Sequence, residues 1–276
     1  MNLQLLSQRS APVRIFIFLS ILGISALPLV ISVYLLLEKA KIDTNWAMLC
    51  FALGLIILLP WWNKYIHQQP DQFQHYGLEV SRQNGVELLR GLAIGLISIQ
   101  ILFVLQGLLG WLQWQQPNSS IFRFILEAIP TALGTALAEE LLFRGWIYDE
   151  LERDYKPNIV IWASSLIFAV SHFLKPLPEI IRTSPQFFGL LLLALTLAWA
   201  KQNHRRRLGL SIGIHAGLIW GWYVINVGKL IKYSGTVPQW VTGVNDNPLA
   251  GVMGIIFLFL LALWMRQSRK NNLTKQ

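Results

Sequence analysis

Eight apolar stretches dominate this chain and limit what it can fold into. They cover, approximately, residues 14–37, 46–62, 88–112, 122–148, 158–174, 187–200, 208–228 and 249–265. An α-helix needs about 20 residues to cross the hydrocarbon core of a bilayer, and most of the stretches reach or approach that length. The sequence therefore predicts an all-α, polytopic membrane protein that consists of a bundle of about eight transmembrane helices.

The composition excludes the main soluble classes of protein. Only 13% of the 276 residues are charged, whereas a soluble domain carries about 25%. The hydrophobic fraction of 54% is more apolar surface than a soluble core of this size can bury. These values argue against a cytosolic enzyme, a disordered protein and a nucleic-acid-binding domain. We expect residues 1–276 to form a single transmembrane domain whose main partner is the lipid bilayer.

The net charge of +9 is explained by membrane topology, so no nucleic-acid partner is expected. With the N-terminus in the cytoplasm and eight crossings, seven of the 23 Lys and Arg residues fall on the far side, which leaves 16 in cytoplasmic segments. The seven are Lys39, Lys41, Arg123, Lys175, Arg182, Lys229 and Lys232. Cytoplasmic loops of membrane proteins are enriched in Lys and Arg, so this bias predicts that both termini are cytoplasmic.

The fourth apolar stretch contains three charged residues, Glu139, Glu140 and Arg144. An ionised side chain at the centre of a transmembrane helix costs about 2.5–3.5 kcal/mol, so these groups are expected to face the bundle interior. Glu140 and Arg144 are four residues apart and can pair on one helix face. Glu139 is rotated by about 100° from Glu140 and can stay free to act as a general base. The alternative is that both glutamates pair with Arg144 and only stabilise the fold.

Two histidines, His172 and His215, lie in the fifth and seventh stretches. With a rise of 1.5 Å per residue, Glu139 and His215 lie about 14 and 12 Å from the cytoplasmic ends of their helices. His172 comes out about 8–10 Å deeper, so helix tilt or a shifted helix end is needed to bring the three together. The HExxH zinc-protease motif, the P-loop and a GxGxxG motif with flanking strands are absent from the sequence.

The ordered set of Glu139-Glu140-x-x-x-Arg144, Phe168-x-x-x-His172 and His215 resembles the CPBP family of intramembrane proteases. This family includes the type II CAAX prenyl endopeptidases and the Abi-type bacterial proteins. The motifs lie in a core of about residues 122–228. The resemblance implies a glutamate-type peptidase in which Glu139 activates a water with help from His172, Glu140 and Arg144 orient the site, and His215 stabilises the oxyanion. It also implies a membrane-embedded or lipid-anchored peptide substrate, and a bacterial inner membrane or thylakoid membrane.

One position departs from the family pattern. Ile219 stands four residues after His215, where the family often has Asn or Asp, and Asn226 is a candidate replacement on roughly the same helix face. The loss of one oxyanion donor typically lowers the rate about 10²–10³-fold. Three alternatives to the glutamate mechanism therefore stay open. They are a zinc-dependent peptidase with Glu139, His172 and His215 as ligands, a catalytically weak or inactive scaffold or chaperone, and a transporter. The glutamate mechanism itself requires no cofactor.

Overall fold

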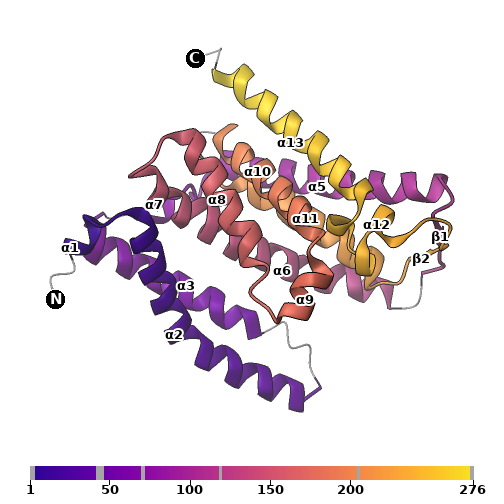
Figure 1. The fold of residues 1–276 in the computed structure, drawn as a ribbon, viewed down its shortest axis with the longest axis horizontal. Helices are drawn as coiled ribbons and strands as arrows, with labels where there is room; N and C mark the ends of the chain where they lie inside the picture. Colours follow the sequence, from indigo (N-terminus) through magenta and orange to yellow (C-terminus); the bar gives the residue numbers. More distant parts are fainter. Residues whose placement is uncertain (1–3, 42–46, 70–71, 118–119, 204–205, 274–276) are drawn as a thin grey trace.

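The computed structural model describes residues 4–41, 47–69, 72–117, 120–203 and 206–273, and nearly all of the regular structure in them is helical (Figure 1). The long helices are α2 (Ala11–Lys39), α3 (Met48–Trp62), α5 (Arg82–Leu108), α6 (Ile121–Glu140), α8 (Pro157–Ser171), α10 (Gln186–Asn203), α11 (Gly209–Asn226) and α13 (Val252–Leu273). Each of the eight predicted stretches coincides with one of these helices. Residue 46 of the second stretch, and Arg205 and Lys275 from the charge count, lie outside the described residues.

Short elements connect the long helices. They are α1 (Gln4–Ser7), the π-helix η2 (Asn63–His67), α4 (Gln72–His75), the π-helix η3 (Leu141–Ile147), α7 (Tyr148–Glu152), α9 (Leu177–Thr183), α12 (Gln239–Thr242) and the 3₁₀ turns η4 (Val244–Asp246) and η5 (Pro248–Ala250). A two-stranded antiparallel sheet pairs β1 (Leu112–Trp114) with β2 (Ile231–Tyr233). The fold is therefore nearly all-α, as the sequence predicts, and aromatic and β-branched residues beyond the ends of α5 and α11 form this one small sheet.

Fewer than eight helices are long and apolar enough to cross a membrane unaided. In the described part of the chain three qualify by length and composition, namely Ala11–Lys39, Arg82–Leu108 and Ile121–Glu152. A fourth results if α9 and α10, which meet at a bend of 72°, count as one span. Several of the remaining helices have only 15 to 18 residues, which is below or close to the lower limit of about 17 residues for a span. The protein is therefore an integral membrane protein with several long apolar helices.

Helices α5 and α11 make the most extensive contact in the structure, and glycine is what allows it. A Cβ atom built on Gly91 would collide with the carbonyl oxygen of Leu210, and one on Gly213 would collide with the carbonyl oxygen of Leu88. Small residues at such positions let two helix backbones approach closely within a membrane. This contact fixes α11, the helix that carries His215, against α5.

We expect Gly91→Ala to destabilise the protein by about 1–3 kcal/mol, because the added methyl group overpacks the α5–α11 contact. Gly85→Ala in the same helix is the matched control, since nothing lies within 4 Å of the position that its Cβ would occupy. Thermal unfolding in detergent micelles measures both variants. Equal melting temperatures for the two variants would contradict the predicted close packing.

An aromatic cluster joins the N-terminal helices to η3. The ring of Trp146 stacks on Phe18 of α2 at 3.8 Å between centroids, and it lies edge-on to Trp62 of α3 at 5.9 Å. Trp62 and Trp146 are fully buried. The α2–α3 pair is thereby packed directly against the segment that follows the glutamate pair.

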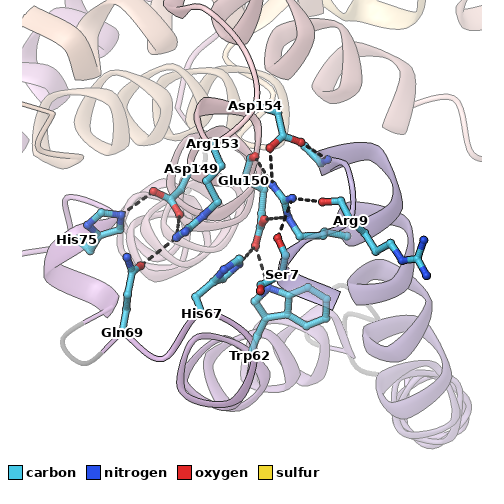
Figure 2. Close-up of polar contacts among 12 residues, drawn as sticks. Ser7, Arg9, Trp62, His67, Gln69, His75, Asp149, Glu150, Arg153 and Asp154 are labelled. Atoms are coloured by element: carbon cyan, nitrogen blue, oxygen red, sulfur yellow. Dashed lines mark hydrogen bonds and ion pairs between the residues drawn. The ribbon is translucent and has the colours of Figure 1, made fainter. Parts of the chain in front are cut away.

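Next to this aromatic cluster lies a buried ionic cluster centred on Glu150 of α7 (Figure 2). The Glu150 carboxylate accepts hydrogen bonds from Nε of Arg14 at 2.6 Å and from Nε1 of Trp62 at 2.8 Å. It also lies 2.6 Å from Nε2 of His67. Arg14 is only 2% exposed, so its charge is compensated almost entirely by this cluster. These contacts link α2, α3 and η2 to α7, which continues the helix that begins as α6.

Candidate active site

The glutamate pair lies at the junction between α6 and the π-helix η3. All seven residues of η3 are buried, and π-helical turns are rare and frequently occur at functional sites. Nη1 of Arg144 lies 3.1 Å from Oε1 of Glu140, and both side chains are almost inaccessible to solvent. The Arg144 guanidinium also lies over the ring of Phe168, 4.3 Å from the ring centroid. The structure therefore places Glu140 beside Arg144, as their spacing predicts.

Lys201 and Tyr76 support η3 from outside. The buried Lys201 ammonium of α10 donates a hydrogen bond to the carbonyl oxygen of Arg144 and lies 4.7 Å from the centroid of the Tyr148 ring. Tyr76 packs on Gly145, and burial raises the pKa of the Tyr76 hydroxyl, so that it stays neutral. The sequence contains no sign of this role for Lys201. Lys201 directly follows the apolar stretch 187–200, so it is expected there only as a charge at the cytoplasmic end of a helix.

His215 of α11 lies between the two glutamates. Its Nδ1 is 3.0 Å from Oε1 of Glu140, and its Nε2 is 3.8 Å from Oε2 of Glu139. An ionised carboxylate can only accept a hydrogen bond, so the Nδ1 atom carries a proton when Glu140 is ionised. The paired carboxylate of Glu140 therefore fixes the ring of His215 and points its Nε2 toward Glu139.

Glu139 differs from its neighbour in both exposure and pairing. Its side chain is 29% exposed, whereas that of Glu140 is fully buried. Within the described part of the chain, Oε2 of both glutamates lacks a hydrogen-bond partner, but only Glu140 has its Oε1 paired with Arg144 and His215. One carboxylate is thus held by Arg144 and His215, while the other keeps the capacity to accept a proton.

His172 lies directly after α8 and joins the same group. Its Nδ1 is 2.8 Å from the carbonyl oxygen of Phe168, which can only accept, so Nδ1 is the protonated nitrogen and Nε2 is unprotonated in the neutral ring. The Phe168 ring lies between the two histidines, with centroid distances of 4.6 Å to His172 and 6.2 Å to His215. The depth difference estimated from ideal helices therefore does not separate His172 from the other two residues.

A cavity of about 320 Å³ brings these side chains together. Glu139, His172 and His215 line it, and most of the other lining residues are apolar and come from α5, α10, α11 and α13. Ile219 lines it too, without any group that can donate a hydrogen bond. Asn226 is not among the described residues that line the cavity, because it lies at the end of α11 and its amide donates to the carbonyl oxygen of Trp222. The structure therefore does not support Asn226 as the replacement for the missing Asn or Asp.

The arrangement does not fit the alternative zinc site. Among the described residues, no three His, Cys, Asp or Glu side chains are grouped so that they could hold a metal ion. Glu139, His172 and His215 share the cavity without forming such a group. We therefore derive no chemical step through a metal.

Comparison with known proteins agrees with the motif pattern. Residues 120–231 match the family model described as type II CAAX prenyl endopeptidase Rce1-like. The matched segment runs from the start of α6 to β2 and contains Glu139, Glu140, Arg144, His172 and His215. The resemblance that the three motifs predicted is thereby confirmed for this segment. No curated protein and no solved structure matches the chain.

Proposed function

Because residues 120–231 match the type II CAAX prenyl endopeptidase Rce1-like family, we propose that this protein is an intramembrane endopeptidase with a glutamate-activated water. Its substrate is a membrane-embedded or lipid-anchored protein or peptide. One observation carries the proposal. The Glu139 carboxylate, whose Oε2 atom accepts no hydrogen bond from the described residues, shares a cavity with two histidines, while Glu140 is held by Arg144 and His215.

Glu139 is the general base in this mechanism. It takes a proton from a water in the cavity, and the water oxygen forms a bond to the carbonyl carbon of the scissile peptide bond. The unprotonated Nε2 of His172 accepts a hydrogen bond from the same water and orients it. When the carbon–nitrogen bond breaks, the proton on Glu139 passes to the leaving amine nitrogen.

His215 is the electrostatic partner of the developing oxyanion. Hydrogen-bond donors that are already in place stabilise such a charge strongly in a site that excludes water. Glu140 keeps the imidazole oriented, and Arg144 compensates the Glu140 charge. Glu140 and Arg144 are therefore positioning residues that act through His215.

We further propose that residues 1–276 form one transmembrane domain with about eight membrane-crossing helices and both termini in the cytoplasm. The agreement between the eight apolar stretches and eight helices supports this topology, as does the excess of Lys and Arg in the segments assigned to the cytoplasm. The membrane is a bacterial inner membrane or a thylakoid membrane.

The function is tested with purified protein reconstituted in lipid vesicles. An internally quenched, prenylated peptide with a CAAX terminus serves as substrate, and the release of fluorescence reports its cleavage. We expect cleavage by the wild-type protein, and we expect the rate to persist after treatment with a zinc chelator. Activity that is lost on chelation and restored by added zinc would support the zinc-dependent peptidase instead.

The position of Ile219 favours a second candidate, a catalytically weak or inactive scaffold of the same fold. Ile219 lines the cavity where a donor would serve the oxyanion, and it supplies none. A Glu139→Gln, His172→Ala double variant separates the two functions by complementation of a strain that lacks the gene. The protease predicts that the variant fails to complement, whereas the scaffold predicts full complementation.

A further inference from the structure

A peptide that enters the cavity must satisfy its backbone hydrogen bonds there. A scissile segment is extended rather than helical when its carbonyl is attacked, and each unsatisfied backbone group in a water-poor site costs several kcal/mol. Besides the proposed catalytic group, four of the described residues that line the cavity have polar side-chain atoms. They are Ser98, Gln186, Trp222 and Asn247. Nε1 of Trp222 already donates to the carbonyl oxygen of Asp246 at 3.3 Å.

Asn247 is the best placed of the remaining three, because its side-chain amide has a fixed orientation. Its Oδ1 accepts a hydrogen bond from the backbone N–H of Leu249 at 3.0 Å. An amide nitrogen cannot accept this bond, so the oxygen points to Leu249 and the Nδ2 donor points elsewhere. In the part of the chain that the structure describes, Nδ2 has no hydrogen-bond partner. Asn247, Pro248 and Leu249 all line the cavity.

The loop that carries Asn247 is held in place on both sides. Gly189 of α10 packs against the backbone of Leu249, and Gly254 of α13 packs against the carbonyl of Pro248, with no room for a Cβ atom in either contact. The residue before Asn247, Asp246, has a φ of +58°, a left-handed conformation that non-glycine residues rarely adopt.

We propose that Nδ2 of Asn247 donates a hydrogen bond to a backbone carbonyl of the bound substrate, an assignment that rests on the proposed function. Gln186, at the start of α10, supplies a second amide on the wall of the same cavity. The described lining residues include no Lys or Arg, so the wall offers no cationic partner for an acidic substrate segment. The bond to Asn247 forms in the ground state and persists in the transition state, so it affects binding rather than the rate of the bound complex.

Binding to a variant that does not cleave tests this proposal. In a Glu139→Gln background, fluorescence anisotropy measures the Kd of a prenylated CAAX peptide that carries the fluorophore without the quencher, for protein in lipid nanodiscs. We expect Asn247→Asp, which keeps the acceptor for Leu249 but loses the Nδ2 donor, to bind about tenfold more weakly, as for the loss of one hydrogen bond. Asn247→Ala is expected to lose at least as much. Asn226→Ala, which changes an Asn outside the cavity lining, is expected to bind like the parent.

Two results would overturn the assignment, namely an equal Kd for the Asn247 variants and the parent, and no measurable binding of the peptide to the parent. If the Kd is equal and the turnover rate of the Asn247 variants with Glu139 intact falls about 100-fold or more, Asn247 is an oxyanion donor instead. The anisotropy measurement needs no cleavage, so a weaker Kd for the Asn247 variants together with an inactive wild-type protein would reject the proposed function and keep the binding role. Thermal unfolding of each variant shows whether it is folded.

Discussion

Cleavage of the quenched, prenylated peptide is expected to fall about 10²–10⁴-fold in Glu139→Gln, because the variant lacks the group that takes the proton from water. Gln has nearly the same shape as Glu but cannot act as a base. Among the described residues the Oε2 atom of Glu139 has no hydrogen-bond partner, so its replacement leaves the packing unchanged. We therefore expect the loss to appear in the turnover rate, with a melting temperature close to that of the wild-type protein.

Two control variants show whether the effect is specific to Glu139. Glu127→Gln changes an exposed residue of the same helix that pairs with Arg123, and it is expected to retain full activity. Glu140→Gln is expected to lower both activity and stability, because it weakens the compensation of the buried Arg144 charge. A Glu139→Gln protein that is folded and cleaves at the wild-type rate would exclude the general-base role.

The free energy of unfolding is expected to fall by about 3–5 kcal/mol in Glu150→Ala. The effect is large because the variant removes one partner of the buried Arg14–Glu150 ion pair and leaves the Arg14 charge buried without that partner. Arg14 is 2% exposed and cannot reach solvent in the folded state, and the Nε1 of Trp62 loses its acceptor as well. Thermal unfolding in detergent micelles measures the change.

A rescue and a matched control accompany this prediction. The double variant Arg14→Met, Glu150→Leu removes both charges, and we expect its stability to return close to that of the wild-type protein. Asp154→Ala removes a longer contact to Arg14, 3.4 Å from its Nη2, and the hydrogen bond that Asp154 accepts from the backbone N–H of Ala11. It is expected to cost about 1–2 kcal/mol, which is less than the cost of Glu150→Ala. Equal destabilisation by Glu150→Ala and Asp154→Ala would contradict the buried ionic cluster.

The sequence was sufficient to predict where the helices and the candidate residues lie. Apolar stretches in a chain with so little charge have few alternatives to helices, and each of the eight stretches coincides with one. Charged residues within such a stretch carry a large cost unless they face one another, so Glu140 and Arg144 could be paired from their spacing alone. The matching family segment, residues 120–231, covers the same core.

Other features depend on contacts between distant segments, which residue spacing does not contain. Arg14 was counted as a flanking charge that sets orientation, yet it is buried against Glu150, 136 residues further along the chain. The π-helix η3 changes the helical register after Glu140, and no local pattern in LLFRGWI predicts it. Asn247 lies outside the eight apolar stretches, and only the packing of its loop on α10 and α13 brings it to the cavity.

Mass spectrometry of the prenylated CAAX peptide, incubated in H₂¹⁸O with reconstituted wild-type or Glu139→Gln protein, tests the central proposal. The proposed mechanism predicts two fragments from the wild-type reaction, with ¹⁸O in the new carboxyl group, and essentially no fragments from the variant in the same time. Fragments in equal amounts from the two proteins, or none from the folded wild-type protein, would contradict it.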